Sequence, residues 1–360
     1  MKMVENLERM TLIPALSGYE QKMFDYMEAA FKAEKLEVEG DVFGNCIAKV
    51  PGTNPDADRI MIFGHMDQLG FFVKKIEDDG FLRLERLGGI IEKVLPSVEV
   101  QVQTQNGAMV NGIIGVKSHH ITPPEEKYIV DKYKDLYVDL GAKSYEEVLD
   151  MGIDVGSPVV YRPNFEHLAG TRVYGTSLDN RIACTILLNL ATTLKNIKLE
   201  NDVYLVGSVQ EEYNLRGAMM AARTVKPKIA IALDVALEST TPDTKGVTNV
   251  AIGKGPVMSI YNFHGRGTLN GTIGHPSMVR LVEKTAKASG IPLQKSVGIG
   301  LLTDLSYVQL EGNGVYSLDI GIPCRYTHSP VETCDMKDLE QTSDLLIQVL
   351  KNIDKLENKR

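Results

Sequence analysis

The 360-residue chain contains no tryptophan, and aromatic residues make up only 6% of it. Sugar-binding sites favour flat aromatic platforms, so this scarcity weakens an interpretation as a glycan-binding protein. Excess positive charge is also absent: the net charge is −8, whereas binding to nucleic-acid phosphates needs a basic face. The four cysteines (Cys46, Cys184, Cys324 and Cys334) form no Cys-x-x-Cys pair, and we expect reduced thiols packed as small hydrophobic side chains.

Long apolar runs, an apolar signal region and a serine-hydrolase motif are missing as well. No uncharged run approaches the ~18 residues of a membrane span, and the first residues contain no apolar signal region. Gly-x-Ser-x-Gly is absent, so a serine hydrolase has no sequence support. We therefore expect a cytoplasmic enzyme with neither a nucleic-acid nor a membrane partner.

The composition that is present describes a soluble globular protein. Hydrophobic residues make up 43% of the chain and charged residues 24%, enough to bury a full core. The length fits two domains better than one. Near the start, Ser17 and Glu20 have the spacing of a capping box that opens a helix with a buried stripe from Met23 to Phe31. Residues 36–50 resemble a hairpin, and residues 59–63 a buried strand.

From Phe71 to Phe165 short β-like segments alternate with turn signals such as Asp79-Gly80 and Asn106-Gly107. A short helix with a capping box is expected near Ser144, and the whole segment suggests a small barrel. After Gly170, helices and apolar strands alternate again, as in a sheet covered on both faces. The predicted fold class is α/β: residues 1–70 and 166–360 form a mainly parallel sheet flanked by helices, and residues 71–165 form an inserted β-rich domain.

Two imidazoles and three carboxylates stand where strands or loops could direct them into one cleft. Ligands of open α/β sheets bind beyond the carboxyl ends of the strands, where most of these residues are expected. Two histidines with three acidic residues suit a pair of zinc, cobalt or manganese ions, and thus metal-assisted hydrolysis. The predicted ligands are His65, Asp179, Glu212, Asp234 and His328.

Taken singly, each residue has a plainer explanation: Asp179 as a helix N-cap, Asp234 as a turn residue, His65 as a buried histidine. Adjacent Glu211 and Glu212 are more informative, because two neighbouring carboxylates after an apolar strand repel each other and resist burial unless cations are near. They point to different sides of an extended chain, so one can hold a metal while the other faces the substrate. Asp67 lies two residues after His65 and can orient its ring.

The remaining histidines carry less information. His119 and His120 are expected at the surface of the insert, and His167, His264 and His275 have no carboxylate at a meaningful spacing. We interpret these three as structural.

The motifs together resemble the tetrahedral (TET-type) dinuclear metallo-aminopeptidases, a family that includes glutamyl aminopeptidases. The resemblance covers nearly the whole chain and rests on ordered motifs: Ser17-Gly18-Tyr19-Glu20, His65-Met66-Asp67, Asp139-Leu140-Gly141-Ala142-Lys143-Ser144, Leu178-Asp179-Asn180-Arg181, Gln210-Glu211-Glu212 and His328-Ser329-Pro330-Val331-Glu332. It implies that Asp179 bridges two metals, one also held by His65 and Asp234, the other by Glu212 and His328. Glu211 is then the general base, and Asp67 the residue that orients His65.

The resemblance also implies short peptides with a free amino terminus as substrates. It implies a homo-oligomer of up to twelve subunits, assembled through the insert. Departures from the family pattern at Gln68, Tyr213-Asn214 and Thr303-Asp304-Leu305 bear on substrate preference and efficiency. Two alternatives remain open: a glycoside hydrolase, which needs two opposed carboxylates and no metal, and a catalytically weak peptide-binding homologue.

Overall fold

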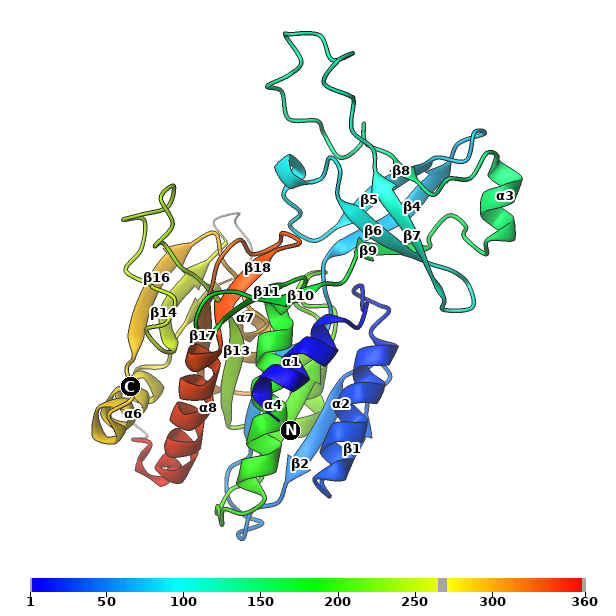
Figure 1. Cartoon of the computed structure of the whole chain (residues 1–360). Helices are drawn as coiled ribbons and strands as arrows, with labels where there is room; N and C mark the ends of the chain where they lie inside the picture. The colour runs from blue at the N-terminus through cyan, green and yellow to red at the C-terminus, as the bar shows by residue number, and fades with distance from the viewer. Residues whose placement is uncertain (1, 265–270, 358–360) are drawn as a thin grey trace.

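A computed structural model describes residues 2–264 and 271–357 of the chain. A mixed sheet forms the centre of an α/β body, and a small closed barrel projects from it (Figure 1). In spatial order the central strands are β1 (Glu37–Gly40), β2 (Cys46–Val50), β12 (Val203–Ser208), β3 (Ile60–His65), β13 (Ile229–Leu237), β17 (Tyr316–Cys324), β14 (Val257–Phe263) and β15 (Gly271–Ile273), with β16 (Gln294–Ile299) paired to β14.

The middle of this sheet is parallel, antiparallel strands attach on both sides of it, and β16 pairs with β14 in the parallel sense. β12 pairs in parallel with β3, β3 with β13, and β13 with β17. β2 and β14 attach to this group in the antiparallel sense. Parallel strands bring their carboxyl ends to one edge, so the sheet can present several loops to a single site.

Helices cover both faces of the sheet, as expected for a parallel core. One face packs against α1 (Met3–Thr11), α2 (Gln21–Ala33), α4 (Leu178–Leu194), α6 (Pro276–Ser289) and α8 (Met336–Lys351). The other carries α5 (Gly217–Val225) and α7 (Leu305–Val308). The two apolar cores are separate clusters, one on each side of the sheet. A 3₁₀ turn, η2 (Ile353–Lys355), follows α8.

The barrel is closed by six antiparallel strands around its own apolar core. Its strands, in order, are β4 (Gly70–Ile76), β5 (Leu82–Leu87), β8 (Val138–Asp139), β7 (Met109–Ile114), β6 (Glu99–Gln103) and β9 (Pro158–Tyr161), with η1 (Glu92–Val94) and α3 (Tyr145–Asp150) in its loops. Closure removes exposed sheet edges. A three-stranded sheet of β10 (Phe165–His167), β11 (Arg172–Gly175) and β18 (Glu332–Asp335) follows the barrel.

The predicted fold class is confirmed, with corrections in detail. The capping box at Ser17 and Glu20 is wrong: α2 begins at Gln21, the Glu20 side chain caps no helix N–H, and the Ser17 hydroxyl donates to Asp67 instead. At Ser144 the hydroxyl does accept the Glu147 N–H, as predicted.

All four cysteines are free and buried, also as predicted. No helix among the described residues is long and apolar enough to cross a membrane.

Candidate metal centre

The structure brings all five predicted ligands together beyond the middle of the sheet. His65 ends β3, Asp234 lies within β13, and Glu212 follows the end of β12. Asp179 lies in the first turn of α4, where its backbone is not helical, and His328 lies in the loop between β17 and β18. Two sequence expectations shift slightly, since His65 and Asp234 belong to strands that were predicted to end before them.

The ligand atoms form two groups that share Asp179. His65, Asp179 and Asp234 make one group, and Asp179, Glu212 and His328 the other; within each, the donor atoms lie within 4.8 Å of one another. His65 Nε2 is 3.1 Å from Asp179 Oδ1, and His328 Nε2 is 3.5 Å from Asp179 Oδ2. Tetrahedral ligands at 2.0–2.1 Å from zinc lie about 3.4 Å apart, so the donor set fits two divalent metals.

Burial and mutual repulsion perturb the carboxylates strongly. Burial raises the pKa of Glu211 well above its ordinary value against the opposing charge of His65, and it raises the pKa of Glu212 to about 7. Burial and the charge of Asp179 likewise raise the pKa of Asp234. These shifts mark negative charge that the protein alone does not neutralise, and a cation bound there would offset it.

Asp67 fixes the loop that carries Glu211 and Glu212. Its Oδ1 lies 3.4 Å from His65 Nδ1 and accepts the Glu211 N–H at 3.0 Å, while Oδ2 accepts the Glu212 N–H at 3.1 Å. The Ser17 hydroxyl donates to Oδ2 at 2.5 Å. Asp67 therefore holds the backbone of both glutamates as well as lying against the histidine ring. The sequence suggested only the contact with His65.

Several residues of the site occupy left-handed backbone conformations, which cost on the order of 1–3 kcal/mol each outside glycine. Ser177 has φ 56°, Gln210 φ 56° and His328 φ 68°. Buried carboxylates compensate: Glu332 accepts the Asp179 N–H at 2.9 Å and the His328 N–H at 2.6 Å, and Glu20 accepts the Gln210 N–H at 3.1 Å. Strain concentrated around one set of side chains is typical of a functional site.

Glu20 and Glu332 were missed as supporting residues by the sequence reasoning, although both lie in motifs that it quoted. The usable signal was an acidic residue among apolar neighbours close to a candidate ligand. Arg181 was missed too: it is fully buried and donates to the carbonyls of Met10, Ile13 and Met66, tying the His65 loop to the end of α1.

The departures from the family pattern have different positions. Gln68 is buried away from the pocket, where its side-chain oxygen accepts the Ala15 N–H and an Arg181 N–H. Tyr213 is half exposed and stacks on Arg216. Asn214 instead lines a pocket that contains Asp179, Glu212 and His328. Gln68 therefore supports the loop and does not face a substrate.

A pocket of about 310 Å³ opens over the centre. Its walls include Glu211, Glu212 and His328. Val235, His264, Leu301 and Leu302 extend the walls beyond the metal ligands. The interpretation of His264 as purely structural is thus incomplete.

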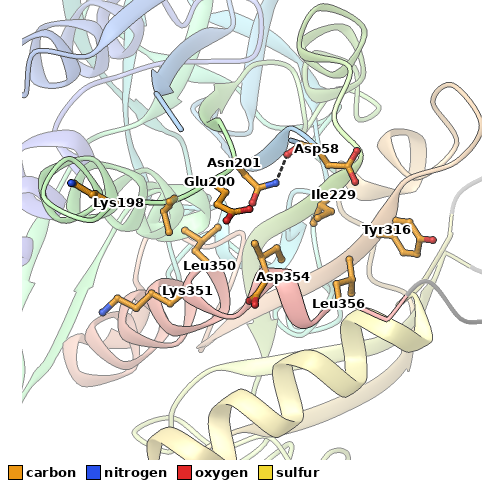
Figure 2. Close-up of a pocket in the computed structure, with 12 residues that line it drawn as sticks. Asp58, Lys198, Glu200, Asn201, Ile229, Tyr316, Leu350, Lys351, Asp354 and Leu356 are labelled. Carbon is orange, nitrogen blue, oxygen red and sulfur yellow. Dashed lines mark hydrogen bonds between the residues drawn. The ribbon is translucent and has the colours of Figure 1, made fainter. Parts of the chain in front are cut away.

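A second pocket, of about 420 Å³, lies at the opposite, amino-terminal edge of the strands (Figure 2). Lys198, Glu200 and Asp354 give it mixed charge, and Asn201 donates to the Asp58 carbonyl. Among the described residues, no histidine or cysteine lines it. The metal-ligand chemistry is therefore at the carboxyl-terminal edge.

The chain is similar to known aminopeptidases in sequence and in structure. The family model described as M42 glutamyl aminopeptidase matches residues 44–345. SgcX of Escherichia coli (strain K12) is 40% identical over 333 residues, covering 92% of this chain and 89% of SgcX. The structure of aminopeptidase APDkam598 from Desulfurococcus kamchatkensis is similar, with a TM-score of 0.90, 34% identity and coverage of 99% and 98%. TET1 peptidase of Pyrococcus horikoshii, described as assembling into a tetrahedron or a large octahedral shell, gives a TM-score of 0.85, 31% identity and coverage of 97% and 99%.

Proposed function

Because the chain belongs to the M42 glutamyl aminopeptidase family, we propose that it removes residues stepwise from the amino ends of short peptides, using two divalent metal ions. The observation that carries this proposal is the pair of ligand groups joined by Asp179 beside the Glu211 carboxylate. His65, Asp179 and Asp234 hold one ion, and Asp179, Glu212 and His328 the other. The ligand types suit zinc or cobalt, with manganese as a further candidate.

When bound, such ions acidify water at neutral pH and polarise the scissile carbonyl. Glu211 acts as the general base: its carboxylate lines the pocket, and its Oε2 lies 3.8 Å from His65 Nε2. It takes the proton of the attacking water and returns it to the leaving amine. Asp67 keeps the Glu211 and Glu212 backbone fixed during this exchange.

The direction of cleavage is part of the same proposal, and the aminopeptidases among the similar proteins support it. Asp179, Glu211, Glu212 and Asp234 line the pocket, so a free ammonium group can pair with a carboxylate there. A glycoside hydrolase needs two carboxylates without metal ligands between them, whereas here two imidazoles lie against the shared aspartate. The aminopeptidase reaction therefore accounts for more of the site.

Assembly into a homo-oligomer of up to twelve subunits, with the barrel as a contact domain, is part of the same proposal. The shells formed by the TET1 peptidase support it, as does a barrel with a closed core of its own.

Hydrolysis of aminoacyl chromogenic substrates tests the reaction. Activity should disappear with a chelator and return with zinc, cobalt or manganese. A catalytically weak peptide-binding homologue would bind peptides without hydrolysing them under any of these conditions. Full activity in a preparation shown by elemental analysis to lack metal would disprove the proposed mechanism.

A further inference from the structure

The loop of the barrel between β5 and η1 reaches the metal centre. Gly88 and Gly89 follow β5 and lie in the loop that leads to η1. Gly89 lines the pocket over the centre, and its carbonyl oxygen lies 2.7 Å from Nδ1 of His328. A carbonyl oxygen only accepts hydrogen bonds, so Nδ1 must carry the proton and donate it. In the neutral imidazole the lone pair is then on Nε2, which faces Asp179 and Glu212.

This loop lies very close to the side chains of the site. A Cβ atom on Gly89 would lie 2.9 Å from Nδ1 of His328, and one on Gly88 would lie 3.2 Å from Oε2 of Glu212. Gly88 also has a φ of +86°, so its turn alone accounts for a glycine. Gly89 is not among the glycines with positive φ, and the backbone conformation does not require a glycine there. The narrow space beside His328 is what requires a glycine at this position.

The two histidines of the centre differ in the origin of their support. His65 Nδ1 faces the carbonyl of Asp67 at 3.2 Å and its carboxylate at 3.4 Å, both from the α/β body. His328 lies in a loop with a left-handed backbone, and its ring is supported on the Nδ1 side by the barrel. Partners of this kind fix the tautomer and direction of a metal-binding imidazole.

We propose that the inserted barrel completes the second metal group, because the Gly89 carbonyl positions the ring of His328. Gly89 is thus a positioning residue, and the barrel serves the reaction as well as assembly. This inference rests on the proposed function, since it assumes that His328 binds metal. It adds a role for the insert that the sequence did not suggest.

The variant Gly89→Ala tests the inference, with Gly298→Ala as the matched control. Gly298 also lacks a positive φ, and a Cβ there would meet nothing within 4 Å. Metal titration and elemental analysis of the dialysed, full-length protein should show one tight equivalent retained in Gly89→Ala. The second equivalent should weaken by about 10–100-fold, the usual effect of losing a partner of a ligand. Gly298→Ala should bind both equivalents like the wild type.

The outcomes separate this inference from the proposed function. A wild-type protein that binds no metal would disprove the proposed function itself. If the wild type binds two metals and Gly89→Ala binds both with unchanged affinity, only the role of Gly89 is disproved. Should Gly89→Ala misfold, an experimental structure of the metal-loaded wild type decides. A Gly89 oxygen within about 3.2 Å of His328 Nδ1 supports the inference, and a longer separation overturns it.

Discussion

The neighbouring residues Glu211 and Glu212 have different surroundings despite their shared loop. Oε2 of Glu211 lies 3.8 Å from His65, and Oε1 of Glu212 lies 4.0 Å from His328. Only Glu212 belongs to a group of potential ligands. The proposed function therefore assigns Glu211 as the base and Glu212 as a ligand, although the two side chains are chemically identical.

This division predicts different defects for two conservative variants. Glu211→Gln should keep metal content near normal while turnover falls by roughly 10²–10⁴-fold, because an amide cannot accept the proton. Glu212→Gln should weaken binding of one metal, because a neutral amide is a poorer ligand. Elemental analysis and steady-state kinetics on both variants measure the two effects. The opposite pattern would show that the two roles are exchanged.

The arrangement of the strands and helices explains why part of the site could be predicted from the sequence. His65 and Glu212 follow apolar strand-like runs, and parallel strands in an α/β sheet bring such residues to one edge whatever the details of packing. Asp179 could be placed only by the family motif, because its local sequence equally suits a helix cap. Local pattern and sheet topology thus locate the site.

Contacts between segments far apart in the chain could not be predicted from the sequence. Ser17 and Glu20 have the spacing of a capping box, but their side chains bond to Asp67 and Gln210, fifty or more residues away. The strand β14 was missed, since its polar residues Ser259 and Asn262 interrupt the apolar signal. No local sequence feature connects Gly88-Gly89 to His328. Such pairings depend on the completed fold.

The buried Asp319 on β17 predicts a pH dependence of stability. It accepts hydroxyl hydrogen bonds from Thr303 at 2.5 Å and Thr272 at 2.6 Å, yet burial raises its pKa from 3.8 to about 6. Its folded-state pKa exceeds the unfolded value, so its ionised form destabilises the protein above about pH 6. Its contribution to the free energy of unfolding should therefore rise as the pH falls from 7 towards 4, by up to about 3 kcal/mol.

Asp319→Asn, with a neutral amide, should lack this contribution. Denaturant unfolding of both proteins at several pH values measures the difference between their pH profiles. Parallel profiles for wild type and variant would show that Asp319 does not titrate in this range.

The pocket walls predict the preferred first residue of the substrate. Val235, His264, Leu301 and Leu302 carry neither a carboxylate nor an ammonium or guanidinium group. Leucyl and methionyl substrates should therefore exceed glutamyl and lysyl ones by about tenfold or more in kcat/KM. Leu301→Glu should shift the preference towards lysyl substrates. A wild-type preference for a charged first residue would contradict this account of the walls.

At the scale of the whole molecule, the barrel is proposed to serve both assembly and the metal centre. Replacing residues 71–165 by a short linker should give a particle with fewer subunits in light scattering. The affinity of the protein for the second metal ion should also fall. The α/β body keeps its own cores on both faces of the sheet, so it has the means to fold. An unchanged number of subunits per particle would refute the assembly role, whatever happens to the metal.

The central claim is that the whole molecule is a metal-dependent aminopeptidase, and one mass-spectrometric time course tests it most directly. An unblocked decapeptide and its N-acetylated copy are incubated with the metal-loaded protein, with and without a chelator. The account predicts a ladder that loses residues from the amino end of the unblocked peptide alone, and no ladder with the chelator. Loss of residues from the carboxyl end, internal cuts, or a ladder that persists with the chelator would contradict it.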